Sequence, residues 1–128
     1  MTDVTEYLDL DDVLELAVRL LGEPVPIRDV GLLEAAIARP GATAFGHDAY
    51  PDIATKGAAL LHSIVKNHAL IDGNKRLGWL ATAVFLELNT ASVAEAANDD
   101  VYNLVIKVAS EDVEIADIAA ELTRLAGD

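Results

Sequence analysis

The sequence of 128 residues contains no cysteine, which excludes disulfide bonds, thiolate catalysis and cysteine-ligated metal sites. Aromatic residues make up only 5% of the chain, so alanine, leucine, valine and isoleucine must fill the core. Small aliphatic side chains of this kind favour the packing of helix on helix over a β-sandwich or a barrel. The length suits a single folding unit, and we therefore predict one all-α domain over residues 1–128.

Basic residues are also scarce, because 9 Lys and Arg stand against 22 Asp and Glu, giving a formal net charge of −13. This balance opposes binding to the phosphate backbone of nucleic acids and docking on anionic membranes, both of which need clustered cations. The chain has no apolar run of membrane-spanning length, and its first ten residues show no signal-peptide pattern. We expect a soluble, cytoplasmic protein without direct nucleic-acid or membrane contacts.

Apolar residues that recur at helical spacing predict about six helices, arranged around a central one. Asp9 is predicted to cap the first helix, Asn98 or Asp99 the fifth, and Ser110 the sixth. Leu77–Leu88 is apolar on nearly all sides, which is typical of a helix buried in the centre of a fold. The remaining helices are expected over Leu10–Leu21, Val30–Ala38 and Ile53–His68.

Residues Ala42–Asp52, with the sequence ATAFGHDAYPD, interrupt the helical pattern. They hold two of the few aromatic residues together with a glycine and a proline, which predicts a short hairpin or an ordered loop. For Phe45 and Tyr50 two interpretations remain open. The aromatic rings either dock a protein target or cover the core.

The segment Lys66–Arg76 holds the side chains best suited to chemistry. Its charged residues are Lys66, Asp72, Lys75 and Arg76. They give the segment a net charge of +2 within a strongly acidic chain, when histidine is neutral. If Gly73 and Asn74 turn into the next helix, the N–H groups of its first turn and the helix dipole favour a phosphate group.

Each polar side chain of this segment has a candidate role. Lys75 and Arg76 oppose the dipole at a helix start, a conflict that a bound anion would resolve. Asp72 is placed to reach a Mg²⁺ ion on the same phosphates. His68 suits a general base that acts on a hydroxyl, the role in which histidine is the most common residue type. The alternative is purely structural: a turn, a helix cap and solvated cations.

His62, His68 and Asp72 could also indicate a metal-hydrolase site, but their spacing opposes this interpretation. The six-residue separation of the two histidines does not place them on one helical face, and no third strong ligand is evident. We therefore expect His62 to be a partly buried helix residue.

The motif HALIDGNKR at His68–Arg76 resembles the signature of the Fic/Doc family, His-x-Phe-x-Asp/Glu-Gly-Asn-x-Arg. Its Asn-Lys-Arg ending is similar to that of the Doc branch, the toxins of death-on-curing toxin–antitoxin pairs. The resemblance extends upstream to GLLEAAIARP, AFGHDAYPD and ALLHSIVKNH, and so covers Gly31–Leu88. The chain departs from the pattern at Leu70, where Phe is usual, and at Trp79, where Fic adenylyltransferases carry a second Arg; Trp79 is instead expected in the core.

The resemblance implies a role for each residue of the motif. His68 would be the general base, and Asp72 would hold Mg²⁺. The nucleotide phosphates of ATP would be bound by Gly73, Asn74, Lys75 and Arg76. Ala42–Asp52 would be the family's flap, which aligns a target segment by backbone pairing, with the docking residues Phe45, Gly46 and Tyr50.

For function, the resemblance implies a Doc-like toxin that transfers phosphate from ATP to a Ser or Thr hydroxyl of a translation factor such as elongation factor Tu. A Fic-type adenylyltransferase, which Lys75 and Trp79 disfavour, is one alternative. An inactive helical interaction module, which the complete motif disfavours, is another. Because the chain lacks the family's internal inhibitory motif, we expect a cognate antitoxin that inserts an amphipathic helix into a groove between helices.

Overall fold

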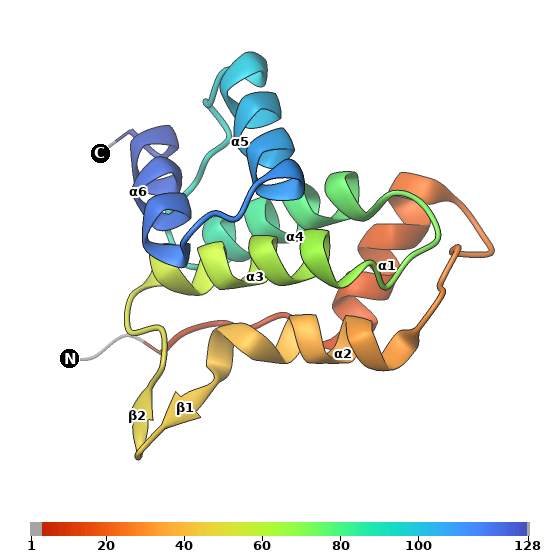
Figure 1. Cartoon of the computed structure of the whole chain (residues 1–128), viewed down its shortest axis with the longest axis horizontal. Helices are drawn as coiled ribbons and strands as arrows, with labels where there is room; N and C mark the ends of the chain where they lie inside the picture. Colours follow the sequence, from red (N-terminus) through yellow and green to blue (C-terminus); the bar gives the residue numbers. More distant parts are fainter. Residues whose placement is uncertain (1–3, 128) are drawn as a thin grey trace.

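The computed structural model describes residues 4–127, which form six α-helices, one 3-10 turn and a two-stranded hairpin. In chain order the elements are α1 (Leu10–Leu21), α2 (Val30–Ala38), η1 (Arg39–Gly41), β1 (Thr43–Ala44), β2 (His47–Asp48), α3 (Ile53–Asn67), α4 (Asn74–Leu88), α5 (Asn98–Ser110) and α6 (Ile115–Leu125). The all-α fold predicted from the sequence is confirmed (Figure 1). Among the described residues, no helix combines the length and the apolar character that crossing a membrane requires.

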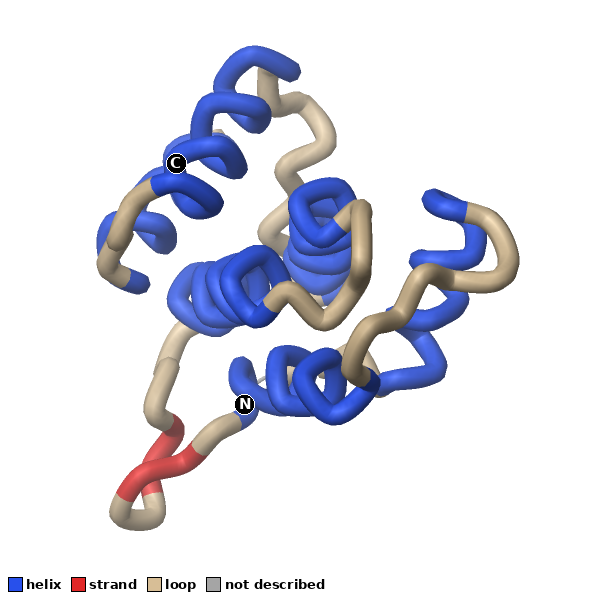
Figure 2. The backbone as a smooth tube through the Cα atoms, turned by 45° about the vertical axis from the view of Figure 1, so that its right-hand side comes forward, coloured by secondary structure: helices blue, strands red, loops and turns tan. Residues whose placement is uncertain are grey.

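Helices α3 and α4 pack against each other at the centre of the domain. Glycines make this contact close: a Cβ added at Gly78 would lie 2.8 Å from Val65 Cγ2, and one at Gly57 would lie 3.0 Å from Leu86 Cδ2. Figure 2 shows α5 and α6 on one side of this pair, and α1 and α2 on the other. The single core that results places the α3–α4 turn at one end of the domain.

The composition of helix α4 predicts burial on nearly all sides. The helix is central, but one of its sides is only partly covered by protein. Leu77 and Phe85 are buried, whereas Trp79 and Leu80 are only partly covered and Leu88 is 50% exposed. The reason is that α5 packs on α3 and α6 as well as on α4, and leaves a groove of about 430 Å³ beside α4. The expectation of Trp79 in the core is corrected, because its ring lines this groove.

The helix starts show which of the predicted caps form. Asp9 caps α1 as predicted: its carboxylate accepts a hydrogen bond from Asp12 N (2.8 Å), and the Asp12 side chain accepts one from Asp9 N. Helix α5 instead begins at Asn98, with Ala97 at its N-cap, and no side chain caps it. The prediction that Asn98 or Asp99 caps this helix is therefore wrong, because both lie inside its first turn, where Asp99 favours the dipole.

The predicted cap at Ser110 is also wrong. Ser110 is the last residue of α5, and its hydroxyl donates a hydrogen bond to the Ile106 carbonyl (2.7 Å). The chain then runs extended, and α6 begins at Ile115 with Glu114 at its N-cap. A serine hydroxyl can bond either forwards at a helix start or backwards within the last turn, and here the backward bond forms.

Residues 42–52, which interrupt the helical pattern, form a hairpin. This is one of the two forms predicted for the segment. Its two-residue turn consists of Phe45 and Gly46, with φ of 54° and 79°, and positive φ at both positions is what a type I′ turn requires. Phe45 is fully exposed, so the interpretation in which it covers the core is wrong. The hairpin projects from the domain next to the start of α3 (Figure 1).

A buried lysine ties β2 to α3. The Lys56 side chain is 1% exposed, and its Nζ lies 3.1 Å from Asp48 Oδ2 and 5.7 Å from the centre of the Tyr7 ring. Burial by itself lowers the pKa of Lys56, but the Asp48 carboxylate and the Tyr7 side chain raise it by more, so the pKa lies above its usual value. The charged ammonium group therefore stays paired and holds the hairpin on the domain.

A second polar cluster surrounds Arg39. Its Nε donates a hydrogen bond to the Tyr50 hydroxyl (2.9 Å), and its guanidinium lies 5.5 Å from the centre of the Tyr50 ring. One terminal nitrogen of Arg39 lies 2.9 Å from both His62 Nδ1 and Ser63 Oγ. Burial, and then the charge of Arg39, lower the pKa of His62. His62 is thus a partly buried helix residue as predicted, and Tyr50 serves to hold Arg39.

Candidate functional site

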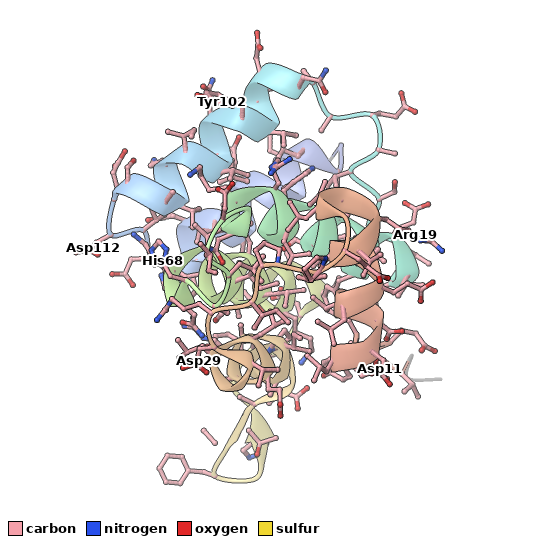
Figure 3. The ribbon with its side chains drawn as sticks, turned by 90° about the vertical axis from the view of Figure 1, so that its right-hand side faces the viewer. Asp11, Arg19, Asp29, His68, Tyr102 and Asp112 are labelled. Atoms are coloured by element: carbon pink, nitrogen blue, oxygen red, sulfur yellow. The ribbon has the colours of Figure 1, made fainter. Side chains whose placement is uncertain are left out.

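The site predicted from the motif lies in the turn between α3 and α4. His68 ends α3 in the left-handed conformation, with φ 51° and ψ 45°, and its side chain is exposed (Figure 3). The next two residues, Ala69 and Leu70, are each 2% exposed and anchor the turn in the core. Leu70 therefore fills the anchoring position, although it is smaller than the phenylalanine of the family pattern.

Asn74 closes this turn with its side chain. Asn74 Oδ1 accepts a hydrogen bond from Leu70 N (3.0 Å), and Asn74 Nδ2 donates one to the Leu70 carbonyl (2.9 Å). The amide group predicted to hold phosphate is thus engaged in the turn itself. Its contribution to an anion site comes chiefly from its backbone N–H, at the first position of α4.

Gly73 is favoured at the start of α4 by its backbone conformation. Its φ of 92° lies in the left-handed region, which residues with a Cβ adopt only at a cost. A Cβ at Gly73 would also lie 2.8 Å from Cδ2 of Leu21, at the end of α1. No side chain caps this helix start, so the N–H groups of its first turn remain open to a ligand.

Three charged side chains surround the open helix start. Asp72, Lys75 and Arg76 are exposed, and none of them forms an ion pair with another side chain of residues 4–127. Together with the N–H groups of the first turn, the two cations make this helix start electropositive, as the predicted anion site requires. The arrangement fits multiple phosphate oxygens, which need several donors of this kind.

The same residues fit a magnesium ion only together with a phosphate ligand. Nowhere in the described part of the chain do three or more acidic or histidine side chains gather as a metal site. Mg²⁺ is typically held by one or two carboxylates, the substrate phosphates and water. Asp72 supplies one exposed carboxylate next to the anion site, which meets this limited requirement.

A segment that was not among the predicted site residues lies beside His68. Pro26–Asp29, between α1 and α2, runs antiparallel to the turn: Arg28 N donates to the Ala69 carbonyl (2.8 Å), and Ile71 N donates to the Pro26 carbonyl (2.7 Å). The Arg28 guanidinium also reaches the His68 carbonyl. Pro24 and Pro26 favour an extended chain here, but they do not predict that this stretch pairs with the turn that carries His68.

The hairpin, in contrast, is not brought to the site. It precedes the first residue of α3, whereas His68 follows the last, and a helix of 15 residues is about 22 Å long. Figure 1 shows the hairpin and the α3–α4 turn at opposite ends of α3. Phe45, Gly46 and Tyr50 therefore do not gather with His68, and the extended backbone next to His68 is Pro26–Asp29.

The groove beside α4 begins at Lys75 and Arg76, the cations of the predicted anion site. Its lining residues are Leu20, Lys75, Arg76, Trp79, Leu80, Asn98, Val101, Tyr102, Val105 and Ile106. Most of them are apolar, and two are the cations of the anion site. A molecule bound along this groove would therefore also contact the residues that are placed to hold phosphate.

Comparison with known proteins places these features in a family context. A model described as the Fic/DOC family matches residues 7–86, from the segment before α1 into α4. Among curated proteins, the chain is similar to "Toxin Doc" of Mycolicibacterium smegmatis, with 47% identity over 124 residues. The alignment covers 96% of this chain and 95% of that protein, so the similarity extends over the whole domain and is not limited to the motif.

Proposed function

Because this chain belongs to the Fic/DOC family, we propose that it is a Doc-type toxin that transfers the γ-phosphoryl group of ATP to a serine or threonine hydroxyl of a protein. The observation that carries the proposal is the α3–α4 turn. It presents an exposed histidine and an exposed carboxylate beside a helix start without a side-chain cap, together with two cations that form no ion pair within residues 4–127. Phosphoryl transfer depends mostly on positioning and charge stabilisation, which this set of groups supplies.

Each group has a defined part in the reaction. The substrate hydroxyl oxygen forms a bond to the γ-phosphorus, the bond to the β–γ bridging oxygen breaks, and ADP leaves. His68 accepts the hydroxyl proton. Lys75, Arg76 and the N–H groups of the first turn of α4 hold the phosphate oxygens. A Mg²⁺ ion held by Asp72 and the phosphates would neutralise part of their charge.

The substrate segment is proposed to lie along Pro26–Asp29. This backbone adjoins the turn that carries His68. Its N–H groups already bond to the Ala69 and Val25 carbonyls, so a substrate segment would donate main-chain hydrogen bonds to the Ile27 or Arg28 carbonyl. Ile71, three residues after His68, is 73% exposed and offers an apolar contact in the same place. Docking of the protein substrate at Phe45, Gly46 and Tyr50 stays a prediction. It applies only to substrates large enough to contact the hairpin and His68 at the two ends of α3.

Labelled ATP tests the reaction directly. We expect the purified protein to transfer label from the γ-position of ATP to elongation factor Tu, the first substrate to test on the family resemblance. Intact-mass analysis of the factor should show the gain of one phosphoryl group. Transfer of label from the α-position would indicate adenylylation instead, and a protein that binds no ATP with Mg²⁺ would be the inactive interaction module.

The groove beside α4 is proposed to bind a cognate antitoxin. Its apolar lining fits the apolar stripe of an amphipathic helix, and its start at Lys75 and Arg76 lets such a helix block the nucleotide phosphates. The net charge of −13 favours an antitoxin with basic flanks, so association should slow as salt is raised.

Co-expression tests this docking site. The protein alone should arrest growth, and the antitoxin should relieve the arrest. Tyr102 lines the groove and is 66% exposed, so Tyr102→Asp should leave the toxin folded but weaken its neutralisation at least tenfold. Leu88→Asp is the matched control, since Leu88 is half-exposed at the other end of α4. Unchanged neutralisation of the Tyr102 variant would show that the antitoxin binds elsewhere.

A further inference from the structure

The end of α3 presents a structural problem at the residue proposed as the base. The last carbonyl groups of a helix have no partners within it. His68 also leaves the helix in the left-handed conformation, which is disfavoured for a residue with a Cβ. Without outside support, this residue would relax, and the direction of its imidazole ring would change with its backbone.

Arg28 supplies that support from a distant part of the chain. Its Nε donates a hydrogen bond to the His68 carbonyl (2.9 Å), and one terminal nitrogen donates to the same oxygen. The same nitrogen also reaches the Asn67 carbonyl, at 3.4 Å. The positive charge of Arg28 is also favourable at this position, because the C-terminal end of α3 is the negative end of the helix dipole.

The main chain of Arg28 fixes the next peptide group as well. Its N–H donates to the Ala69 carbonyl (2.8 Å), so one residue holds the carbonyls of both His68 and Ala69. The other nearby cation, Lys66, points elsewhere, with its Nζ 3.4 Å from the Ala109 carbonyl. Arg28 is thus the arginine that determines how the chain turns at His68.

We propose that Arg28 is a positioning residue, which holds His68 in its left-handed conformation and thereby aims the imidazole at the incoming hydroxyl. The catalytic part of this inference rests on the proposed function. Arg28 lies in Pro26–Asp29, the segment proposed to align the substrate, so the base and the docked substrate share one rigid support. Small displacements of a reacting group are enough to lower a rate strongly.

Three variants separate this role from other roles of an arginine. Arg28→Met removes the charge and the side-chain hydrogen bonds to the His68 and Asn67 carbonyls but keeps the main-chain bond to Ala69, whereas Arg28→Lys keeps the charge but lacks the planar fork. Arg19→Met is the matched control, because Arg19 is an exposed arginine of α1 that pairs with Glu15, away from His68 (Figure 3). Arg28 and Arg19 are both exposed, so the three variants are expected to fold.

The first measurement does not need the enzymatic reaction. Backbone NMR couplings and chemical shifts of His68 should report a left-handed residue in the wild type and in Arg19→Met, and a loss of that conformation in Arg28→Met. An unchanged His68 signal in Arg28→Met would overturn the inference, whether or not the protein transfers phosphate. If His68 does shift but the wild type has no transferase activity, the proposed function fails and the structural role of Arg28 stands.

The second measurement is the kinetics of transfer. We expect kcat to fall about 10- to 100-fold in Arg28→Met, while the Kd for ATP changes less than twofold. Arg28→Lys should recover only part of the loss. Full recovery by lysine would show that charge alone matters, and a weakened ATP affinity in Arg28→Met would make Arg28 a phosphate ligand; either result contradicts a positioning role.

Discussion

Replacing His68 by asparagine should lower the rate of phosphoryl transfer by about 10²- to 10⁴-fold, the usual contribution of a general base. ATP affinity should stay within a few-fold of the wild type, because the base contacts the incoming hydroxyl and the phosphates are held by α4. Asparagine is the preferred replacement, since it adopts the left-handed conformation of this residue more readily than alanine does.

Comparison of two variants controls for backbone effects. His68→Ala removes the same base, but alanine disfavours the left-handed conformation at this position. The alanine variant should therefore lose as much activity as His68→Asn and have a lower melting temperature than His68→Asn. Single-turnover measurements with labelled ATP would give the transfer rates, and isothermal titration would give the ATP affinities. Near-normal turnover of His68→Asn would show that another group accepts the proton. Both variants should also relieve the growth arrest.

Removing either Lys75 or Arg76 should weaken ATP binding by about 10- to 100-fold, which corresponds to the loss of charge-assisted hydrogen bonds to phosphate. The weaker binding of ATP should not be accompanied by a loss of folding stability. Both side chains are exposed and without an ion-pair partner among the described residues, and both oppose the dipole at the start of α4. The melting temperatures of Lys75→Ala and Arg76→Ala should therefore equal or exceed that of the wild type.

The matched control for this pair is Arg19→Ala. It changes the net charge by the same amount, but Arg19 lines a hollow with Val84 and Leu88 towards the far end of α4. The ATP affinity of Arg19→Ala should equal that of the wild type, apart from a small effect of net charge that added salt removes. Unchanged ATP binding in Lys75→Ala or Arg76→Ala, accompanied by a lower melting temperature, would assign these cations a structural role instead.

Much of the helical framework follows from the sequence because its signals are local. The cap at Asp9 and the span Val30–Ala38 depend on residues within a few positions of each other. Where two local solutions compete, the sequence does not decide between them. Ser110 was predicted to cap the sixth helix, but its hydroxyl bonds backwards to the Ile106 carbonyl and it ends α5 instead.

The sequence alone determined the all-α class, the family motif and the charged residues around the α3–α4 turn, because composition, helical spacing and a contiguous motif are all read within one stretch of chain. Only the tertiary structure decided what surrounds that turn. It placed Arg28 on the His68 carbonyl, 40 residues away in sequence, and left the hairpin at the opposite end of α3. It also opened the groove at Trp79, because whether an apolar helix is covered on all sides depends on how its neighbours pack, and no pattern within the helix itself records that.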